Sequence, residues 1–237
     1  MQEHDVVSIE RALESWAEGW RTKDARLAAK ARRALGEVPG RAPHRELTPY
    51  GEAAELVADL DTPTSGQVFI GDVDLTMLSE KALTLLRRRK VGFVFQAYNL
   101  VPTLTAAENI TLPLDIAGEE PEKAWFDRVV DTVGIRDRLS HRPAELSGGQ
   151  QQRVAIARSL VNEPAILLAD EPTGNLDSRT SEEVMAIFQA LNDEGKTVIL
   201  ITHEPDIAEY AKRVVHFRDG LVERVEAGHR SGAPVHS

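Results

Sequence analysis

The sequence contains no cysteine, which excludes disulfide bonds and thiolate metal sites and fits a reducing compartment such as the cytosol. It also lacks an apolar run of about 20 residues and has an acidic N-terminus, so we expect no transmembrane helix and no signal peptide. Positive charge is in the minority. The formal net charge of -10 argues against a generic nucleic-acid-binding surface, and we expect the basic run Arg87 to Lys90 to be a solvated helix end.

Apolar residues are frequent enough for a folded core. The 237 residues are 42% hydrophobic and 28% charged, which suits one α/β domain with a short appendage. Near-continuous apolar runs at 165–169 and 197–202 flank a helical stretch from Ser181 to Leu191. This pattern is typical of strands in a buried parallel sheet. We therefore predict an α/β fold with a parallel sheet core.

Further elements are predicted on both sides of these strands. Short β-favouring runs at 67–70 and 91–95 enclose a polar helical stretch at 79–89. Three segments with helical spacing follow, at 106–110, 121–133 and 150–161, with Pro102, Pro113 and Pro143 as interruptions. Near the end, 214–217 and 221–225 surround Asp219-Gly220, a dipeptide suited to a hairpin turn.

The first 55 residues differ in character from the rest of the chain. A loose helical pattern runs from Ile9 to Leu35, and prolines and glycines make the stretch from Gly36 to Gly51 irregular. We predict three parts: an atypical, mainly helical segment 1–55, a core 56–226 and a C-terminal tail 227–237. A helical subdomain at about 100–160 is expected within the core.

The segment Leu146-Ser147-Gly148-Gly149-Gln150 leads directly into a helical stretch that continues to Arg158. One interpretation is local: Ser147 caps the helix and Gln150 closes a capping box. The other is functional, because two glycines permit close approach and a helix N-terminus offers free N–H groups to a phosphate. The residues alone do not decide between the two.

Two more candidate sites follow predicted strands. The apolar run Ile166 to Ala169 delivers the adjacent carboxylates Asp170 and Glu171 to its C-terminal end, where α/β sheets bind ligands. A strand that simply exits into an acidic turn is the local alternative. His203 follows the run 197–202, where an imidazole could reach a phosphate oxygen, although a single histidine is more often structural.

Together these segments resemble the ATPase subunits of ATP-binding-cassette (ABC) transporters, which have a P-loop-NTPase-like sheet with a helical subdomain. The resemblance covers about residues 56–226 and identifies 146–150 as the signature motif, 166–172 as Walker B and 174–177 as the loop that reaches across the dimer. It implies ATP and Mg²⁺ as cofactors. The implied ligands of ATP held by the opposite subunit are Ser147, Gly148, Gly149, Gln150 and Asp177.

The same resemblance implies the remaining roles. Asp170 would hold Mg²⁺ through water, and Glu171 would orient and deprotonate the attacking water. His203 would sense the γ-phosphate. Gln96, which ends the run 92–95, would touch the metal and water while its loop meets the permease.

The stretches 93–113 and 61–66 most resemble the subgroup that serves lipoprotein release and macrolide export. The implied protein is an ATP-binding subunit that couples ATP binding and hydrolysis to a membrane permease, from the cytoplasmic face of the membrane. A second ATPase subunit would complete a homo- or heterodimer, and no nucleic acid is implied. A DNA-repair ATPase with the same motifs would need long coiled-coil heptads, which this sequence does not have.

The chain departs from the family where Walker A is expected. About a dozen residues before Asp61 the family has Gly-x-x-x-x-Gly-Lys-Ser/Thr, whereas His44 to Gly51 reads His-Arg-Glu-Leu-Thr-Pro-Tyr-Gly. This segment offers no lysine for the phosphates, and Pro49 removes a backbone donor. Gly195-Lys196-Thr197 is no substitute, because Ala190 stands at the first glycine position and a strand follows.

Three hypotheses are compatible with this departure, and they leave the enzymatic competence of the chain open. The first is a working transport ATPase with a phosphate cradle formed in another way. The second is a degenerate subunit that completes the site of an intact partner. The third is an inactive product in which residues 1–55 replace the native segment. The helical opening of residues 1–55 weakly resembles the first helix of small polyketide-cyclase-like domains.

Overall fold

The computed structural model describes residues 68–218 and 221–228. Several predictions lie outside these residues: the helix at 9–35, the irregular stretch at 36–51, the start of the core at 56, the Asp219-Gly220 turn and most of the tail. The described residues belong to two compact units. One unit includes 68–79, 215–218 and 221–226, and the other includes 80–214 and 227–228.

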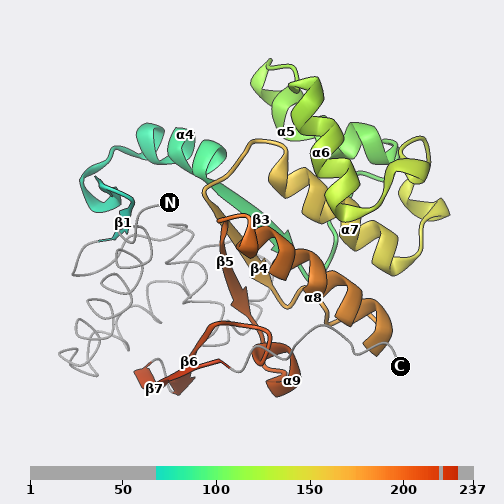
Figure 1. Ribbon diagram of the computed structural model, residues 1–237. Coiled ribbons are helices and arrows are strands. Elements are labelled where there is room, and N and C mark those ends of the chain that lie inside the picture. Colours follow the sequence, from blue (N-terminus) through green and yellow to red (C-terminus); the bar gives the residue numbers. More distant parts are fainter. Residues whose placement is uncertain (1–67, 219–220, 229–237) are drawn as a thin grey trace, which may run out of the picture. The chain divides into compact units, whose positions relative to one another are not determined.

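The larger unit is built on a three-stranded parallel sheet (Figure 1). The strands lie in the order β3 (Val91–Phe95), β4 (Ile166–Asp170) and β5 (Thr197–Ile201). Their register pairs Phe95 with Asp170 and Asp170 with Ile201, so the three strands end at one edge. The predicted α/β fold with a parallel sheet is confirmed, and this edge receives the residues that follow each strand.

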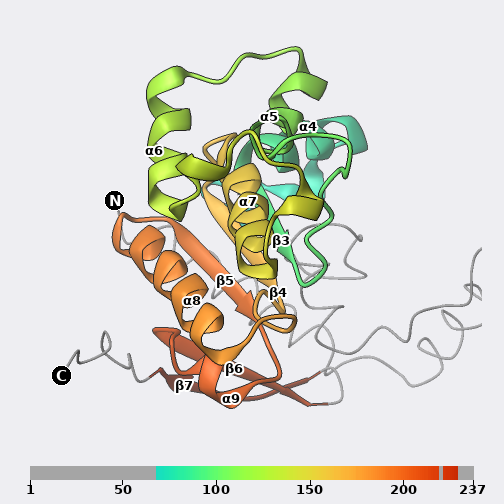
Figure 2. The ribbon, with the colours of Figure 1, turned by 90° about the vertical axis from the view of Figure 1, so that its right-hand side faces the viewer.

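Two helices cover one face of the sheet, α7 (Gly148–Leu160) and α8 (Ser178–Asp193) (Figure 2). Helix α7 packs against β3 and α8 packs against β5, and the two helices contact each other. Gly92 of β3 allows the close approach of α7, because a Cβ atom there would overlap the backbone oxygen of Ser159. The position of α7 on the sheet thus depends on a residue without a side chain.

Two further helices pack on α7, namely α5 (Ala106–Ala117) and α6 (Lys123–Val133). Their buried residues share one apolar core with α7 and include Ile110, Val130 and Ile156. The prediction that Pro113 interrupts the helix is wrong, because α5 continues through it. Ile110 and Leu114 are buried on either side of this proline, so packing offsets the backbone hydrogen bond that proline cannot make.

Helix boundaries differ slightly from the predicted ones. Helix α6 begins at Lys123 rather than Pro121, and Pro143 begins a short 3₁₀ helix, η3 (Pro143–Glu145). The basic run does end a helix, α4 (Glu80–Lys90), but Arg87 and Arg88 are half-buried rather than fully solvated. The remaining elements of this unit are the 3₁₀ helix η2 (Arg136–Arg138) and the short helix α9 (Pro205–Ala208).

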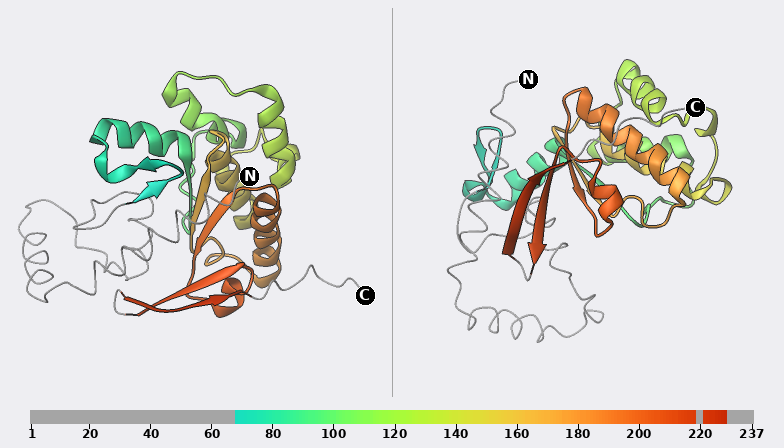
Figure 3. Two further views of the ribbon diagram at one scale, coloured as in Figure 1. Left: turned by 60° about the vertical axis from the view of Figure 1, so that its left-hand side comes forward. Right: turned by 60° about the horizontal axis from the view of Figure 1, so that its bottom comes forward.

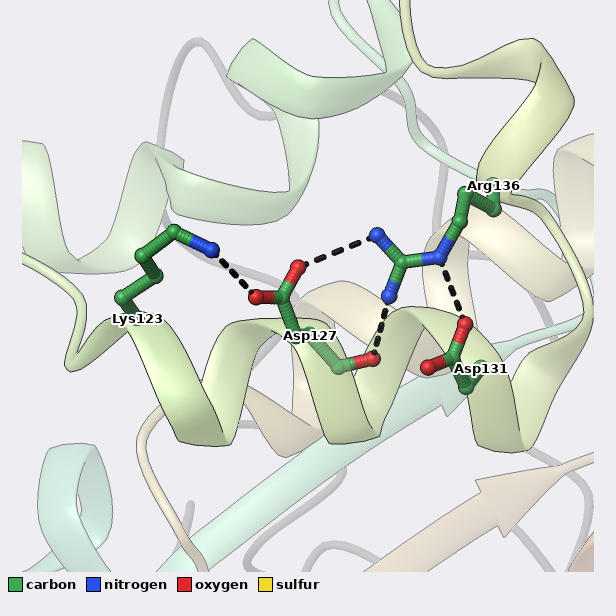
Figure 4. Close-up of polar contacts among 4 residues, drawn as sticks. All are labelled: Lys123, Asp127, Asp131 and Arg136. Carbon is green, nitrogen blue, oxygen red and sulfur yellow. Dashed lines mark hydrogen bonds and ion pairs between the residues drawn. The ribbon is translucent and has the colours of Figure 1, made fainter.

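An ion-pair network lies on the exposed side of α6 (Figure 4). The Arg136 guanidinium contacts the Asp127 carboxylate at 3.0 Å and the Asp131 carboxylate at 2.6 Å, and Lys123 contacts Asp127 at 2.7 Å. Arg136 belongs to η2, so the network ties η2 back to α6. Hydrogen bonds from Lys123 and Arg136 lower the pKa of Asp127, and the hydrogen bond from Arg136 lowers the pKa of Asp131.

Paired strands make up most of the described part of the smaller unit, which includes β6 from residue 215 and β7 up to residue 226. Strands β1 (Phe69–Ile70) and β2 (Val73–Asp74) are antiparallel and are followed by a 3₁₀ helix, η1 (Leu75–Met77). Strands β6 (Arg213–Arg218) and β7 (Leu221–Ala227) form a two-stranded sheet, as predicted (Figure 3). Across the described parts of both units, no helix is long and apolar enough to cross a membrane.

Candidate functional site

The strand ends of β4 and β5 bring Glu171 and His203 together. The Glu171 Oε1 atom lies 2.6 Å from His203 Nδ1 and also accepts a hydrogen bond from the His203 backbone N–H at 3.0 Å. The Thr202 hydroxyl donates to the other carboxylate oxygen at 3.4 Å. The Glu171 side chain is 19% exposed and that of His203 is 72% exposed, so a shielded carboxylate is joined to a solvent-facing imidazole.

This contact favours the charged form of the imidazole. The hydrogen bond with Glu171 raises the pKa of His203 above its ordinary value of 6.5, and the negative charge of Glu171 adds to the effect. The backbone at Glu171 is also unusual, because its φ of 46° lies in the left-handed region that non-glycine residues seldom adopt. A hydrogen bond from Glu171 N–H to the Ile201 carbonyl, at 2.9 Å, holds this turn to the end of β5.

Gln96 lies beside the turn that follows Glu171. A Cβ atom on Gly174 would come within 2.6 Å of Gln96 Nε2, so the amide occupies the space that a side chain at 174 would need. Asn175 Nδ2 donates to the Gln96 carbonyl at 2.9 Å. The structure thus brings Gln96, Glu171 and His203 to the same edge of the sheet.

Asp170 is the last residue of β4 and is half-buried. It stands in register with Phe95 and Ile201, directly before Glu171. Among the described residues, no group of three or more histidine, cysteine, aspartate or glutamate side chains could hold a metal ion. Any ion at Asp170 would therefore need ligands of other kinds in addition.

The segment from Ser147 to Gln150 forms the start of α7. Gln150 N–H donates to Ser147 Oγ at 3.3 Å, and Ser147 N–H donates to Gln150 Oε1 at 3.0 Å. This is the capping box of the local interpretation, and it satisfies two backbone donors at the helix start. The geometry leaves the phosphate interpretation untested, since both accounts use the same helix terminus.

Both glycines of this segment lie where a Cβ atom would meet another side chain of the same chain. A Cβ atom on Gly148 would lie 2.9 Å from the Tyr98 hydroxyl, and one on Gly149 would overlap the methyl group of Thr180. Thr180 also donates its hydroxyl and backbone N–H to the Asp177 carboxylate, at 2.7 and 3.0 Å. Asp177 is thereby the N-cap of α8, and the backbone and hydroxyl hydrogen bonds from Thr180 lower its pKa.

Sequence reasoning missed residues that hold these loops in place. Gln152 is fully buried in α7 and donates from Nε2 to the Pro172 carbonyl at 2.7 Å. The guanidinium of Arg158 donates to the Tyr98 and Asn99 carbonyls at 2.9 and 2.6 Å, and its burial lowers its pKa. A signal existed for Gln152, because it shares a helix face with the buried Ile156 and stands at the start of that apolar stripe.

Comparison with known proteins gives a consistent result. A profile of the ABC transporter family matches residues 53–174. The lipoprotein-releasing system ATP-binding protein LolD of Aquifex aeolicus is 48% identical over 166 residues, which is 69% of this chain and 74% of LolD. The macrolide export ATP-binding/permease protein MacB of Syntrophobacter fumaroxidans is 48% identical over 173 residues, which is 71% of this chain and 24% of MacB.

A solved structure shares the fold. The ATP-binding cassette MJ0796 of Methanocaldococcus jannaschii, a dimer in a post-hydrolysis state bound to ADP and Pi, aligns with a TM-score of 0.66 and 40% sequence identity. The alignment covers 78% of this chain and 82% of that one.

Proposed function

The chain belongs to the ABC transporter family, and on that basis we propose that it is an ATP-binding subunit whose nucleotide lies between two cassettes and drives a membrane permease. The Glu171–His203 pair carries this proposal. Its 2.6 Å contact stands at the C-terminal edge of a parallel sheet, the edge at which α/β proteins bind ligands. The left-handed backbone of Glu171 adds support, because strain of this kind concentrates at functional sites.

The proposed roles follow from the chemistry of the pair. Phosphoryl transfer to water needs a group that orients the water and accepts its proton, and the shielded Glu171 carboxylate is suited to both tasks. His203 is far more exposed, and its Nε2 side is available to a phosphate oxygen while Nδ1 faces Glu171. The raised pKa of His203 favours a positive charge next to the phosphate.

Magnesium is the expected partner of ATP at this edge. Mg²⁺ prefers oxygen ligands and is commonly held by one or two carboxylates together with water and phosphate. The Asp170 carboxylate and the Gln96 amide oxygen would supply donors of that kind, since Asp170 ends β4 and Gln96 follows the adjacent strand β3. When bound, the ion would neutralise charge on the phosphates.

A second cassette is proposed to complete the site. Ser147, Gly148, Gly149 and Gln150 would contact the γ-phosphate of ATP held by that cassette, and the loop with Asp177 would reach across the dimer. The free N–H groups and positive dipole end of α7 support this role. The dimeric state of MJ0796 supports the arrangement.

The names of the relatives support a permease as the further partner. LolD is described as part of a lipoprotein-releasing system, and MacB as an export protein that includes its permease. We propose that this chain likewise acts at the cytoplasmic face of a membrane, with the loop after Gln96 as the permease contact.

A second candidate function is favoured by one observation on the sequence. Nowhere does the chain contain Gly-x-x-x-x-Gly-Lys-Ser/Thr, and His44 to Gly51 contains no lysine. In this alternative, the chain lacks a functional Walker A and binds ATP poorly by itself. It would then supply its signature segment and Asp177 to an intact cassette, and only that cassette's nucleotide would be hydrolysed.

Titration calorimetry with Mg-ATP and a phosphate-release assay test the two functions. If the chain lacks a functional Walker A, as in the second function, the chain alone should bind Mg-ATP weakly and hydrolyse none. Micromolar binding with turnover that is lost in Glu171→Gln would instead indicate a complete ATPase. The second part of the experiment uses an intact cassette that is encoded beside a permease. This cassette is mixed with the chain, and phosphate release by the mixed complex is measured.

The matched variants in the mixed complex are Ser147→Arg and Glu171→Gln. Loss of turnover in Ser147→Arg, with Glu171→Gln harmless, supports the degenerate subunit. Loss in Glu171→Gln supports a site of its own. No binding and no turnover with any cassette would contradict both functions and leave the inactive product.

A further inference from the structure

Gln152 is a buried polar residue with an unusual hydrogen-bond inventory. It is 0% exposed and lies on α7 next to the buried residues Ile156 and Ala155 in the helical pattern. Its Nε2 donates to the Pro172 carbonyl at 2.7 Å, whereas its Oε1 has no hydrogen-bond partner among the described residues. The orientation is fixed by its partner, because a carbonyl oxygen can only accept and so must face the amide nitrogen.

This arrangement has a cost as well as a gain. A buried acceptor without a partner costs free energy, and an apolar side chain at 152 would avoid that cost at Oε1 but would leave the Pro172 carbonyl without the Gln152 donor. Leucine or methionine would therefore exchange one unpaired acceptor for another, with little net change in global stability. The hydrogen bond to Pro172 is the one thing that Gln152 supplies and an apolar residue does not.

The Pro172 carbonyl belongs to the turn that positions Glu171. Two backbone hydrogen bonds already hold this turn: Glu171 N–H to Ile201 O at 2.9 Å, and Gly174 N–H to Glu171 O at 3.1 Å. Neither of them involves α7. Because Glu171 has a φ of 46°, the turn is strained and needs its surroundings to hold it in place.

We propose that Gln152 is a positioning residue, which holds the Glu171 turn against α7 and thereby keeps the Glu171 carboxylate on His203. Helix α7 begins at Gly148, directly after Ser147, so the same rigid element carries the proposed contact to the opposite nucleotide. The hydrogen bond of Gln152 thus connects the helix that begins after Ser147 with the turn that carries Glu171. This inference rests on the proposed function but is tested without ATP.

The first experiment compares wild type, Gln152→Met and Gln151→Met. Methionine keeps the length of the side chain and removes the donor. Gln151 is the matched control, because it is the same residue type on the same helix but donates to the Leu146 carbonyl instead, at 3.1 Å. Thermal unfolding, amide hydrogen exchange and the nitrogen-15 spectrum of the His203 ring are measured for each protein.

We expect Gln152→Met to unfold at about the same temperature as wild type, because it removes the unpaired Oε1 and leaves the Pro172 carbonyl unpaired instead. The amides of Gly174 and His203, which bond to Glu171, should exchange about fivefold faster, as expected for the loss of one typical hydrogen bond. The His203 ring spectrum should move toward that of Glu171→Ala, which marks complete loss of the contact. Gln151→Met should leave the amide exchange at Gly174 and His203 and the His203 ring spectrum unchanged.

A purely structural role for Gln152 predicts the opposite pattern. Lower thermal stability with an unchanged His203 spectrum and unchanged exchange at Gly174 would overturn the proposal. If Gln152→Met does not fold, Gln152→Leu is measured in the same way, and failure of both variants to fold would also overturn it.

A second arm separates this inference from the proposed function. In a complex that hydrolyses ATP by means of Glu171, Gln152→Met should lower kcat by about tenfold or more with little change in KM, because a misplaced group mainly affects the transition state. A chain that never supports turnover through Glu171 contradicts that function, while the His203 spectrum and amide exchange still decide whether Gln152 positions the turn.

Discussion

The start of α7 and the end of β4 carry the two most recognisable motifs of the chain, yet the fold treats their polar groups differently. At the start of α7, Ser147 and Gln150 satisfy each other, and Gly149 is needed to make room for Thr180. At the end of β4, Glu171 adopts a strained backbone and its carboxylate is joined to an exposed histidine. Contacts within the chain account for the first arrangement, whereas the second has a backbone cost that agrees with the role proposed for Glu171.

The largest effect is expected where packing explains the motif. We expect Gly149→Ala to lower the free energy of unfolding by about 1–3 kcal/mol, the usual cost of an extra methyl group in a closely packed site. The cause is overlap with the Thr180 methyl group. Urea denaturation measures the change.

The matched control removes that methyl group and keeps the hydroxyl that bonds to Asp177. Gly149→Ala/Thr180→Ser should therefore recover most of the lost stability. If the single variant were as stable as wild type, the glycine would not be needed for packing, and the contrast with Glu171 would disappear.

A smaller, pH-dependent effect is expected at the end of β4. Glu171→Gln removes the negative charge, so the pKa of His203 should fall back toward 6.5, which a proton NMR titration of the imidazole measures. A group whose pKa is raised by folding contributes stability below its unfolded pKa and loses that contribution as pH rises through the folded value. The stability advantage of wild type over Glu171→Gln should thus be present below pH 6.5 and shrink above it.

Urea denaturation at several pH values checks the sign of this effect. His203→Asn is the matched control, because it removes the titrating group. In the His203→Asn background, the stability difference between Glu171 and Glu171→Gln should no longer depend on pH through the imidazole. A stability difference that grows as pH rises would contradict the Glu171–His203 contact as the source.

The smallest effect is expected at Asp177, the exposed N-cap of α8. Its pKa is lowered by folding, so its charge contributes stability above the unfolded value of 3.8, and this is lost as pH falls through the folded value. Asp177→Asn keeps an oxygen that can cap the helix and should change stability little at pH 7. Asp177→Ala should lose more, because it has no acceptor for Thr180.

Acid denaturation of the three proteins separates charge from capping. Wild type should lose its advantage over Asp177→Asn in acid, while Asp177→Ala should remain the least stable throughout. Equal stability of all three proteins at every pH would show that the Asp177 side chain does not stabilise the fold. Asp177 would then differ from Ser147, whose hydrogen bonds within the chain account for its place.

The sheet and the two main motifs could be predicted because their signals are local. Apolar runs at 91–95, 165–169 and 197–202 are short, bounded and rich in β-favouring residues, and the three strands lie at these places, each within one residue of the predicted bounds. The wrong prediction at Pro113 had a non-local cause, since burial of Ile110 and Leu114 decides whether a helix survives a proline. The assigned chemical roles of the site residues remain predictions.

Sequence by itself determined which residues could act: a pair of carboxylates after a strand, a histidine after the next strand and a glycine-rich helix start. Only the tertiary structure decided how they are held. Parallel pairing of β4 with β5 brought the Glu171 carboxylate into contact with the His203 imidazole. The packing of α7 brought Gln152 to Pro172, twenty residues farther along the chain. Contacts of this kind depend on the register and packing of separate elements, which no local pattern of residues encodes.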